Sequence, residues 1–288
     1  MDMDRKSFIK KSLLGTGAIA IGAAGIGKTA ENQPETIGFN HIQPSPTKIM
    51  GNTVLHKADT RGLADHGWLR SHHTFSFAHY HHPERMRFGA LRVLNDDTVA
   101  AGMGFGTHPH DNMEIISIPL EGDLEHKDSM GNVTVIRNGD IQVMSAGTGI
   151  RHSEFNKNKD SQVKFLQIWV FPKQRNVTPR YDQISLDPAD RVNQLQQILS
   201  PSPDDAGVWI HQDAWFHLGR FDEGKGVGYR VHKAGNGVYA FVLSGSFQVN
   251  GIALDARDGL GIWDTDKFDL AAVAPGSEIL LMEVPMAV

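Results

Sequence analysis

The feature that most constrains the fold is a repeated pattern of short apolar segments separated by glycine-containing turns. Residues 118–147, "IPLEGDLEHKDSMGNVTVIRNGDIQVMSAG", align with residues 241–266, "FVLSGSFQVNGIALDARDGLGIWDTD". Each copy has an apolar segment, a glycine at Gly122 or Gly245, an outgoing segment, a tight turn and a returning segment. An internal repeat of this size indicates that one β unit was duplicated.

Short apolar runs, rather than helical periodicities, fill most of the chain after Ile49, and Asn-Gly pairs such as Asn138-Gly139 and Asn250-Gly251 separate several of them. Many short strands with such turns predict an all-β fold of sandwiches or barrels. A length of 288 residues suits two domains of ordinary size. The expected strands are residues 87–94, 113–120, 132–137, 140–146, 163–171, 237–243, 246–251, 259–264 and 278–286.

The repeat sets the expected domain boundaries, at 49–172 for the first β domain and 208–288 for the second. Residues 31–48 hold three prolines among polar residues and read as a linker. Residues 173–207 are expected to connect the domains. Within them "PADRVNQLQQILS", residues 188–200, predicts a short helix with Val192, Leu195 and Ile198 on one face.

Composition excludes several classes of function. The chain has no cysteine, so disulfides, thiolate nucleophiles and iron–sulfur clusters are excluded, and any metal must be bound by nitrogen and oxygen. The net charge of −5 and the lack of a long basic run in the body of the chain argue against nucleic acid as a partner. Histidine is abundant, with 15 residues.

The first thirty residues differ from the rest. Arg5, Lys6, Lys10 and Lys11 precede an uncharged run from Ser12 to Gly27, as in an export signal. The motif "DRKSFIKK" looks like a twin-arginine signal with lysine in the second basic place. We therefore expect residues 1–30 to direct the chain to the periplasm or otherwise out of the cytoplasm. The run is short and glycine-rich for a membrane span, so no integral span is expected in the mature protein. A cytoplasmic protein with a basic amino-terminal helix, or an uncleaved anchor, are the alternatives.

Two pairs of side chains predict a metal site. Residues at i and i+2 of a strand project from the same face, so His108 and His110 in "GTHPHDNMEI" should point together. His152 and Glu154 in "AGTGIRHSEFN" repeat this spacing after another strand. Three imidazoles and one carboxylate from two strands can hold one metal ion and leave coordination positions open for reactants.

Other polar residues near these pairs receive weaker roles. Glu114 is expected to accept a hydrogen bond from a ligand histidine rather than to bind metal. His79, His81, His82 and His126 are expected at the rim or surface. Met103, Phe105 and Ile115 are expected mainly in the barrel core, with a cavity wall as the alternative.

The second copy of the repeat serves as an internal control. Counting back from Gly245 by the distances that separate His108 and His110 from Gly122 gives Val231 and Lys233, and His232 has the opposite parity. No His-x-Glu pair follows Gly259. The second domain is therefore expected to be free of metal.

Four motifs in order carry a resemblance to a known family: "GFGTHPHDNMEII", "LEGDLEHKDSMGN", "GDIQVMSAGTGIRHSEFN" and "FLQIWV". Together they resemble the pirin family over roughly Ile49 to the carboxyl terminus. The resemblance implies two cupin-type (jelly-roll) β-barrels packed face to face, with short connecting helices. It also implies one mononuclear iron in the amino-terminal barrel, bound by His108, His110, His152 and Glu154.

The resemblance further implies quercetinase-like activity, in which dioxygen opens a flavonol with release of carbon monoxide. The expected partners are thus a small phenolic substrate and O2, with Fe(II) as the expected metal and nickel, manganese, copper or zinc as alternatives. Glu154 is the expected proton acceptor. A redox-sensing protein that binds a partner without turnover, and a metal-dependent sugar isomerase, stay open as alternatives. The exported amino terminus departs from the family pattern and counts against a nuclear role.

Overall fold

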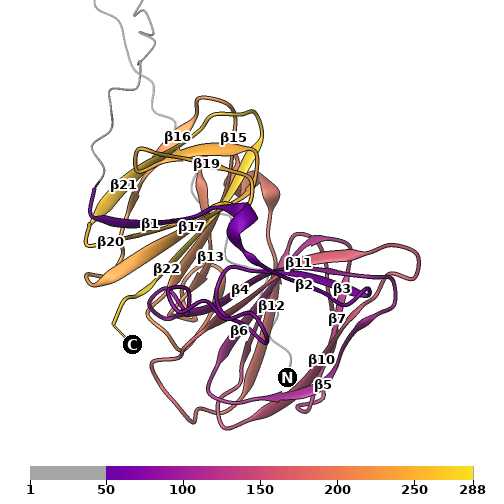
Figure 1. The fold of residues 1–288 in the computed structure, drawn as a ribbon. Coiled ribbons are helices and arrows are strands. Elements are labelled where there is room, and N and C mark those ends of the chain that lie inside the picture. The colour runs from indigo at the N-terminus through magenta and orange to yellow at the C-terminus, as the bar shows by residue number, and fades with distance from the viewer. Residues whose placement is uncertain (1–49, 288) are drawn as a thin grey trace, which may run out of the picture. The chain divides into compact units, whose positions relative to one another are not determined.

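The computed structural model describes residues 50–287, and within that range the regular structure is almost entirely β. The predicted export signal (1–30) and linker (31–48) lie outside this range. The first barrel pairs a seven-stranded sheet with a four-stranded sheet (Figure 1). In sheet order, the large sheet consists of β12 (Arg180–Ser185), β9 (Asp140–Ser145), β6 (Glu114–Glu121), β11 (Val163–Val170), β4 (Leu91–Val99), β3 (Leu69–His73) and β2 (Gly62–Asp65). The small sheet consists of β5 (Gly104–His110), β10 (Ile150–Asn156), β7 (Leu124–Asp128) and β8 (Val133–Ile136).

The second barrel repeats this order strand for strand, which confirms the duplication. Its large sheet consists of β1 (Asn52–His56), β20 (Gly259–Trp263), β17 (Asn236–Ser244), β22 (Ser277–Pro285), β15 (Trp215–Phe221), β13 (Leu195–Ser200) and β14 (Val208–Trp209). Its small sheet consists of β16 (Gly226–Arg230), β21 (Lys267–Ala272), β18 (Ser246–Val249) and β19 (Ile252–Asp255). Gly122 and Gly245 occupy the same turn, with φ of 75° and 70°, a conformation that glycine adopts without steric cost.

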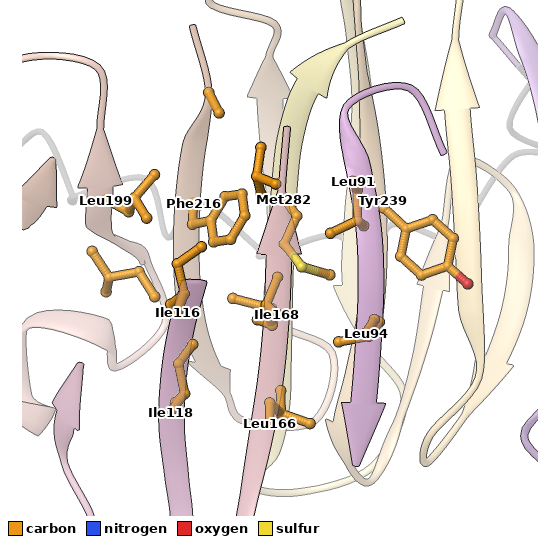
Figure 2. Close-up of a cluster of buried hydrophobic side chains, with 14 of the residues drawn as sticks. Leu91, Leu94, Ile116, Ile118, Leu166, Ile168, Leu199, Phe216, Tyr239 and Met282 are labelled. Carbon is orange, nitrogen blue, oxygen red and sulfur yellow. The ribbon is translucent and has the colours of Figure 1, made fainter. Parts of the chain in front are cut away.

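Alternation of side chains along the central strands makes the two barrels pack through their large sheets. In β6, Ile116 and Ile118 point outward to the other barrel, while Ser117 points into its own barrel. The outward residues form one continuous apolar cluster in which Ile116, Ile168 and Leu94 face Phe216, Met282 and Leu199 (Figure 2). The packing of two cupin barrels face to face, predicted from sequence, is confirmed.

The interiors of the two barrels differ in polarity. The second barrel is filled by one apolar cluster that includes Phe221, Phe247 and Phe268. The first has only two smaller apolar clusters, one around Phe165 and the other around Ile115. Between them, the interior carries buried polar residues, among them His126, His152, Glu154 and Gln167.

The predicted helix at residues 188–200 is wrong. Only Pro188–Arg191 forms a short 3₁₀ turn (η2), capped by the Asp187 side chain, which accepts from the Ala189 N–H. Asn193 then adopts a left-handed conformation with φ of 55°, and the chain continues as β13. Ile198 and Leu199 are buried between the barrels, so tertiary packing overrides the helical spacing. The other short helix, η1, spans Ala58–Thr60.

Strand pairing crosses the domain boundaries expected from sequence. β1, which precedes the first barrel, pairs with β20 of the second (Figure 1). β12, from the expected connector, pairs with β9 of the first barrel, whereas β13 pairs with β15 of the second. β1 and β12 take equivalent edge positions in the two large sheets. Each barrel is therefore completed by a strand from outside its own repeat.

Among the described residues, no helix is long and apolar enough to cross a membrane.

One hydrogen bond tests how β1 is held to the second barrel. The Tyr239 hydroxyl pairs with His56 Nδ1 at 2.9 Å, and both residues are buried. Burial lowers the pKa of His56 to about 4, so the ring is neutral and its nitrogen needs this partner. We expect Tyr239→Phe to lower the free energy of unfolding by about 1–3 kcal/mol, measured by urea denaturation.

Tyr80→Phe is the matched control. The Tyr80 hydroxyl is buried and makes no hydrogen bond, so its removal should cost little or nothing. Equal losses in the two variants would show that the His56–Tyr239 bond contributes nothing specific.

Candidate metal centre

Antiparallel pairing of β5 with β10 brings three of the predicted side chains together. His108 lies directly opposite His152, and His110 lies opposite Ile150. The ring centroids are 4.5 Å apart for His108–His152, 4.8 Å for His108–His110 and 4.9 Å for His110–His152. Each ring offers a nitrogen, and these nitrogens lie within 4.8 Å of one another. The parity argument thus predicted the position of this triad, which could hold a metal ion.

The local sequence fixes how the two β5 histidines point. Pro109 between them is exposed, so the flanking rings turn inward and are half-buried. His108 Nδ1 lies 2.8 Å from the Gly106 carbonyl oxygen. Because that oxygen can only accept, Nδ1 must carry the proton, which leaves the Nε2 lone pair free for a metal.

Glu154 belongs to a second group that shares His152. This group comprises His126, His152 and Glu154, all buried. Glu154 accepts hydrogen bonds from Ser117 Oγ at 3.0 Å and from Gln167 Nε2 at 2.8 Å. The register of β10 against β5 shifts between His152 and Glu154. The four predicted ligands are therefore divided between two overlapping triads, the second of which also contains His126, and the role of Glu154 as a ligand stays a prediction.

Burial sets the charge state of these groups. Desolvation, followed by repulsion from neighbouring imidazoles, lowers the pKa of His152 to about 2 and that of His110 to about 4. Both rings are therefore neutral at neutral pH, the form that binds metal. Burial raises the pKa of Glu154 to about 7, against the opposing effect of the Ser117 and Gln167 hydrogen bonds. His152 is buried, and neither of its ring nitrogens has a hydrogen-bond partner.

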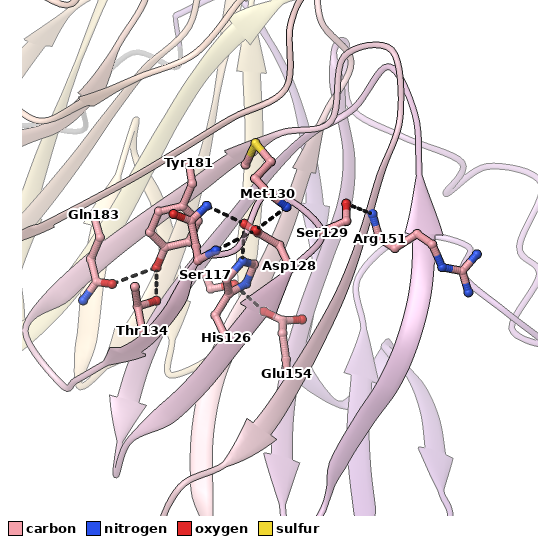
Figure 3. Close-up of polar contacts among 11 residues, drawn as sticks. Ser117, His126, Asp128, Ser129, Met130, Thr134, Arg151, Glu154, Tyr181 and Gln183 are labelled. Carbon is pink, nitrogen blue, oxygen red and sulfur yellow. Dashed lines mark hydrogen bonds and ion pairs between the residues drawn. The ribbon is translucent and has the colours of Figure 1, made fainter.

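His126 is a functional candidate that the sequence analysis placed wrongly at the rim or surface. It is fully buried on β7, with its ring 5.3 Å from that of His152 and 4.7 Å from that of Tyr181. Its Nε2 pairs with Asp128 at 3.1 Å (Figure 3). The available signal was parity, because His126 is two residues from Leu124 and from Asp128 on one strand.

The residues behind His126 hold it in place. Asp128 accepts hydrogen bonds from the Met130 N–H at 2.9 Å and from the Asn132 side chain at 2.8 Å. The Tyr181 hydroxyl bonds to Thr134 at 2.6 Å and to Gln183 at 2.8 Å (Figure 3). The carboxylate of Asp128 thus fixes the orientation of a buried histidine whose ring centroid lies 5.3 Å from that of His152.

Glu114 does not accept from a ligand histidine, so that prediction is wrong. Its carboxyl accepts from Ser145 Oγ at 2.6 Å, and burial raises its pKa to about 7. The reason is local: Asn112 has φ of 44° in the turn between β5 and β6, so side-chain parity does not carry from His110 to Glu114. Ile115, beside it, is buried in an apolar cluster as expected.

Of the triad, His108 lines a cavity of about 230 Å³. His108 and Glu154 lie on one side of it, and the opposite wall comes from the large sheet. Apolar and aromatic side chains contribute much of the lining, namely Ala64, Leu69, Phe77, Ala78, Phe105 and Trp169. Phe105 thus lines the cavity, whereas Met103 is exposed. His79, His81 and His82 are not among its lining residues.

The equivalent positions of the second barrel are aromatic or aliphatic. Strand register places Tyr229 opposite Phe268, as His108 lies opposite His152. By the same registers, Leu270 occupies the position equivalent to Glu154, and Val249 the position equivalent to His126. Val231 occupies the position equivalent to His110. All five belong to that barrel's apolar core or pack against it. Counting back from Gly245 in the sequence therefore gave positions two residues too far toward the carboxyl terminus. The reason is that the loop after β16 is longer than the loop after β5.

Fold and site together define a two-barrel cupin protein with a candidate histidine metal centre in its first barrel. The family model Pirin matches residues 55–170, and the model for the quercetinase C-terminal cupin domain matches residues 197–284. The chain belongs to the pirin family.

The chain is similar to several proteins along most of its length. It is 44% identical over 231 residues to quercetin 2,3-dioxygenase of Escherichia coli K12, covering 80% of this chain and 98% of the relative. It is 41% identical to a putative quercetin 2,3-dioxygenase of Pseudomonas aeruginosa, covering 78% and 97%. Among solved structures, YhhW from Escherichia coli superposes with a TM-score of 0.78 at 43% identity, covering 82% of this chain and 99% of that one. YhhW in complex with nickel(II) gives 0.77 at 42% identity, covering 82% and 100%.

Removal of one imidazole should test the triad directly. We expect His110→Ala to reduce bound metal from about one equivalent to nearly none. The two imidazoles that remain in the triad cannot hold the ion as tightly as three. Metal content is measured by elemental analysis after loading and desalting, and the fold is checked by far-UV circular dichroism.

His82→Ala is the control for loss of a histidine outside the triad, and it should retain the metal. Full metal retention by His110→Ala, or equal loss in both variants, would show that the triad is not the binding site.

Proposed function

We propose that this protein is a metal-dependent dioxygenase that opens the ring of a flavonol or a related phenolic compound with O2. The observation that carries the proposal is that His108 of the histidine triad and Glu154 line a cavity to which apolar and aromatic side chains also contribute. Such a wall suits a flat aromatic molecule, and a metal beside it suits a ring hydroxyl. Relatives that bear the name quercetin 2,3-dioxygenase support the same reading.

The donor set fits a divalent metal. Three imidazoles supply nitrogen, and Glu154 is the proposed fourth ligand. The two unpartnered nitrogens of buried His152 also point to an ion, because a buried polar atom without a partner is costly. We propose Fe(II), as the family resemblance implies. The same donors accept nickel, manganese, copper or zinc, and YhhW was solved with nickel(II).

The residues around the ion have separate roles in the proposed reaction. When bound, the metal supplies Lewis acidity and, if redox-active, electron transfer toward O2. Glu154, which burial makes a stronger proton acceptor than an exposed carboxylate, accepts the proton of the substrate hydroxyl at a carboxylate oxygen. Ser117 and Gln167 hold this carboxylate in place. Trp169, whose ring is 4.9 Å from that of His110, and Phe105 exclude water from the reacting ring.

A turnover assay tests the proposed activity. The full chain is loaded with Fe(II) under anaerobic conditions, mixed with quercetin in air, and followed by the flavonol absorbance band and by carbon monoxide release. We expect loss of the band with the wild-type chain and with His82→Ala. The rate with His110→Ala should fall at least about a hundredfold, because this substitution removes one of the metal ligands. A metal-loaded chain that binds quercetin and leaves it unchanged would contradict the enzyme proposal and favour a sensing role.

We also propose that the chain is exported, on the evidence of residues 1–30 alone. Fractionation of the native host should find it in the periplasmic or otherwise exported fraction. Replacing Arg5 and Lys6 by glutamine should retain it in the cytoplasm, whereas the same change at Lys10 and Lys11 should retain it less. Recovery of the unaltered chain wholly from the cytoplasm would overturn this proposal.

A further inference from the structure

A row of polar side chains crosses the large sheet of the first barrel on its inward face. Direct cross-strand neighbours form this row: His73, Asn95, Gln167, Ser117, Gln142 and Gln183. The four central strands of the second barrel carry His217, Leu281, Ala240 and Leu260 in the corresponding row. Buried polar groups are costly to a fold. The members of this row that line the cavity, His73, Asn95 and Gln167, therefore point to a role in binding.

Three buried side-chain oxygens on the cavity wall formed by this sheet accept no hydrogen bond within the protein. They are Oδ1 of Asp97, Oδ1 of Asn95 and Oε1 of Gln167, on side chains that are 3%, 2% and 7% exposed. All three residues line the same cavity as His108 and Glu154. The orientation of the Gln167 amide is constrained, because its Nε2 donates to Glu154 at 2.8 Å. The indole N–H of Trp169 also lacks a partner and lines the cavity.

This pattern specifies a complementary ligand. Buried acceptors are satisfied by hydroxyl donors, and the single indole donor is satisfied by an oxygen acceptor such as a carbonyl. A molecule with one hydroxyl at the metal and no other polar group would leave the wall oxygens unpaired. A polyhydroxylated aromatic compound would pair them.

We propose that Asp97 is a specificity-determining residue, which accepts a hydrogen bond from a second hydroxyl of the substrate on the wall opposite the histidine triad. Asn95 and Gln167 extend the same acceptor surface. This inference rests on the proposed function and narrows its substrate to polyhydroxylated phenolics.

Asp97 is suited to this task more than to holding the fold. It lies on β4 opposite Ser71 of β3, and its buried Oδ1 has no hydrogen-bond partner within the protein. Burial raises the pKa of Asp97 to about 7. Because a carboxyl group keeps an accepting oxygen whether or not it is protonated, the recognition survives in both forms.

The test compares two flavonols that differ in hydroxyl content. Binding to the full chain loaded with Ni(II) is measured by tryptophan fluorescence quenching without oxygen, so no turnover is needed. Quercetin is the polyhydroxylated probe, and 3-hydroxyflavone keeps only the hydroxyl next to the carbonyl. We expect Asp97→Leu to weaken quercetin binding about tenfold, which corresponds to about 1.4 kcal/mol. Binding of 3-hydroxyflavone should change less than about twofold, the selectivity that a lost hydrogen bond produces.

Two further variants make the result interpretable. Asp97→Asn keeps one accepting oxygen and the shape of the side chain, so it should weaken quercetin only a few-fold, again without affecting 3-hydroxyflavone; it also serves if Asp97→Leu does not fold. Gln142→Leu removes an amide from the same polar row that does not line the cavity, and it should leave both affinities unchanged.

The outcomes separate this inference from the proposed function. Unchanged quercetin binding in both Asp97 variants, or equal weakening of the two flavonols, overturns the role of Asp97 while the metal-site proposal stands. Failure of the wild-type chain to bind either flavonol overturns both.

Discussion

The antiparallel pairing of β5 with β10 is the constraint on which the candidate site depends. It places His108 directly opposite His152, and the two-residue alternation of each strand then adds His110 on the same inward face. Three imidazoles meet without any loop having to fold over them. The surrounding barrel removes water from His110 and His152, and that desolvation keeps these two rings neutral and able to bind a cation. One backbone register thus sets both the geometry and the charge state of the centre.

The polar interior of the first barrel has to be stabilised by other parts of the molecule. Its own apolar clusters are small, whereas the cluster between the large sheets draws residues from both barrels. The second barrel contributes a large apolar cluster in place of the histidine triad. β1 and β12 complete the two large sheets at equivalent edges. The duplicated barrel therefore serves as a support that lets its partner keep costly polar groups inside.

Much of this arrangement could be predicted from sequence, and the failures share a physical cause. Strand positions, the duplication and the histidine triad follow from alternation, which is local. The helix expected at 188–200 does not form, because Ile198 and Leu199 are buried as strand residues in the core between the barrels. The prediction for Glu114 was wrong because the left-handed conformation of Asn112 interrupts the side-chain alternation between β5 and β6. His126 was placed wrongly because it stands outside the two predicted ligand pairs, although its two-residue spacing from Leu124 and Asp128 indicates an inward direction. The position of Glu154 depends on Ser117 and Gln167 from the opposite sheet, which no local pattern reveals.

Gln167 links the two halves of the proposed chemistry. Its amide nitrogen donates to Glu154, the proposed proton acceptor, while its amide oxygen lies unpaired on the cavity wall with Asn95 and Asp97. A planar amide cannot move one of these atoms without moving the other. A substrate hydroxyl that bonds to the Gln167 oxygen therefore also fixes the direction of the N–H that holds the Glu154 carboxylate. In the proposed mechanism, substrate recognition on the large sheet and proton transfer at the small sheet are thus coupled through Gln167, which acts as a positioning residue as well as part of the binding surface.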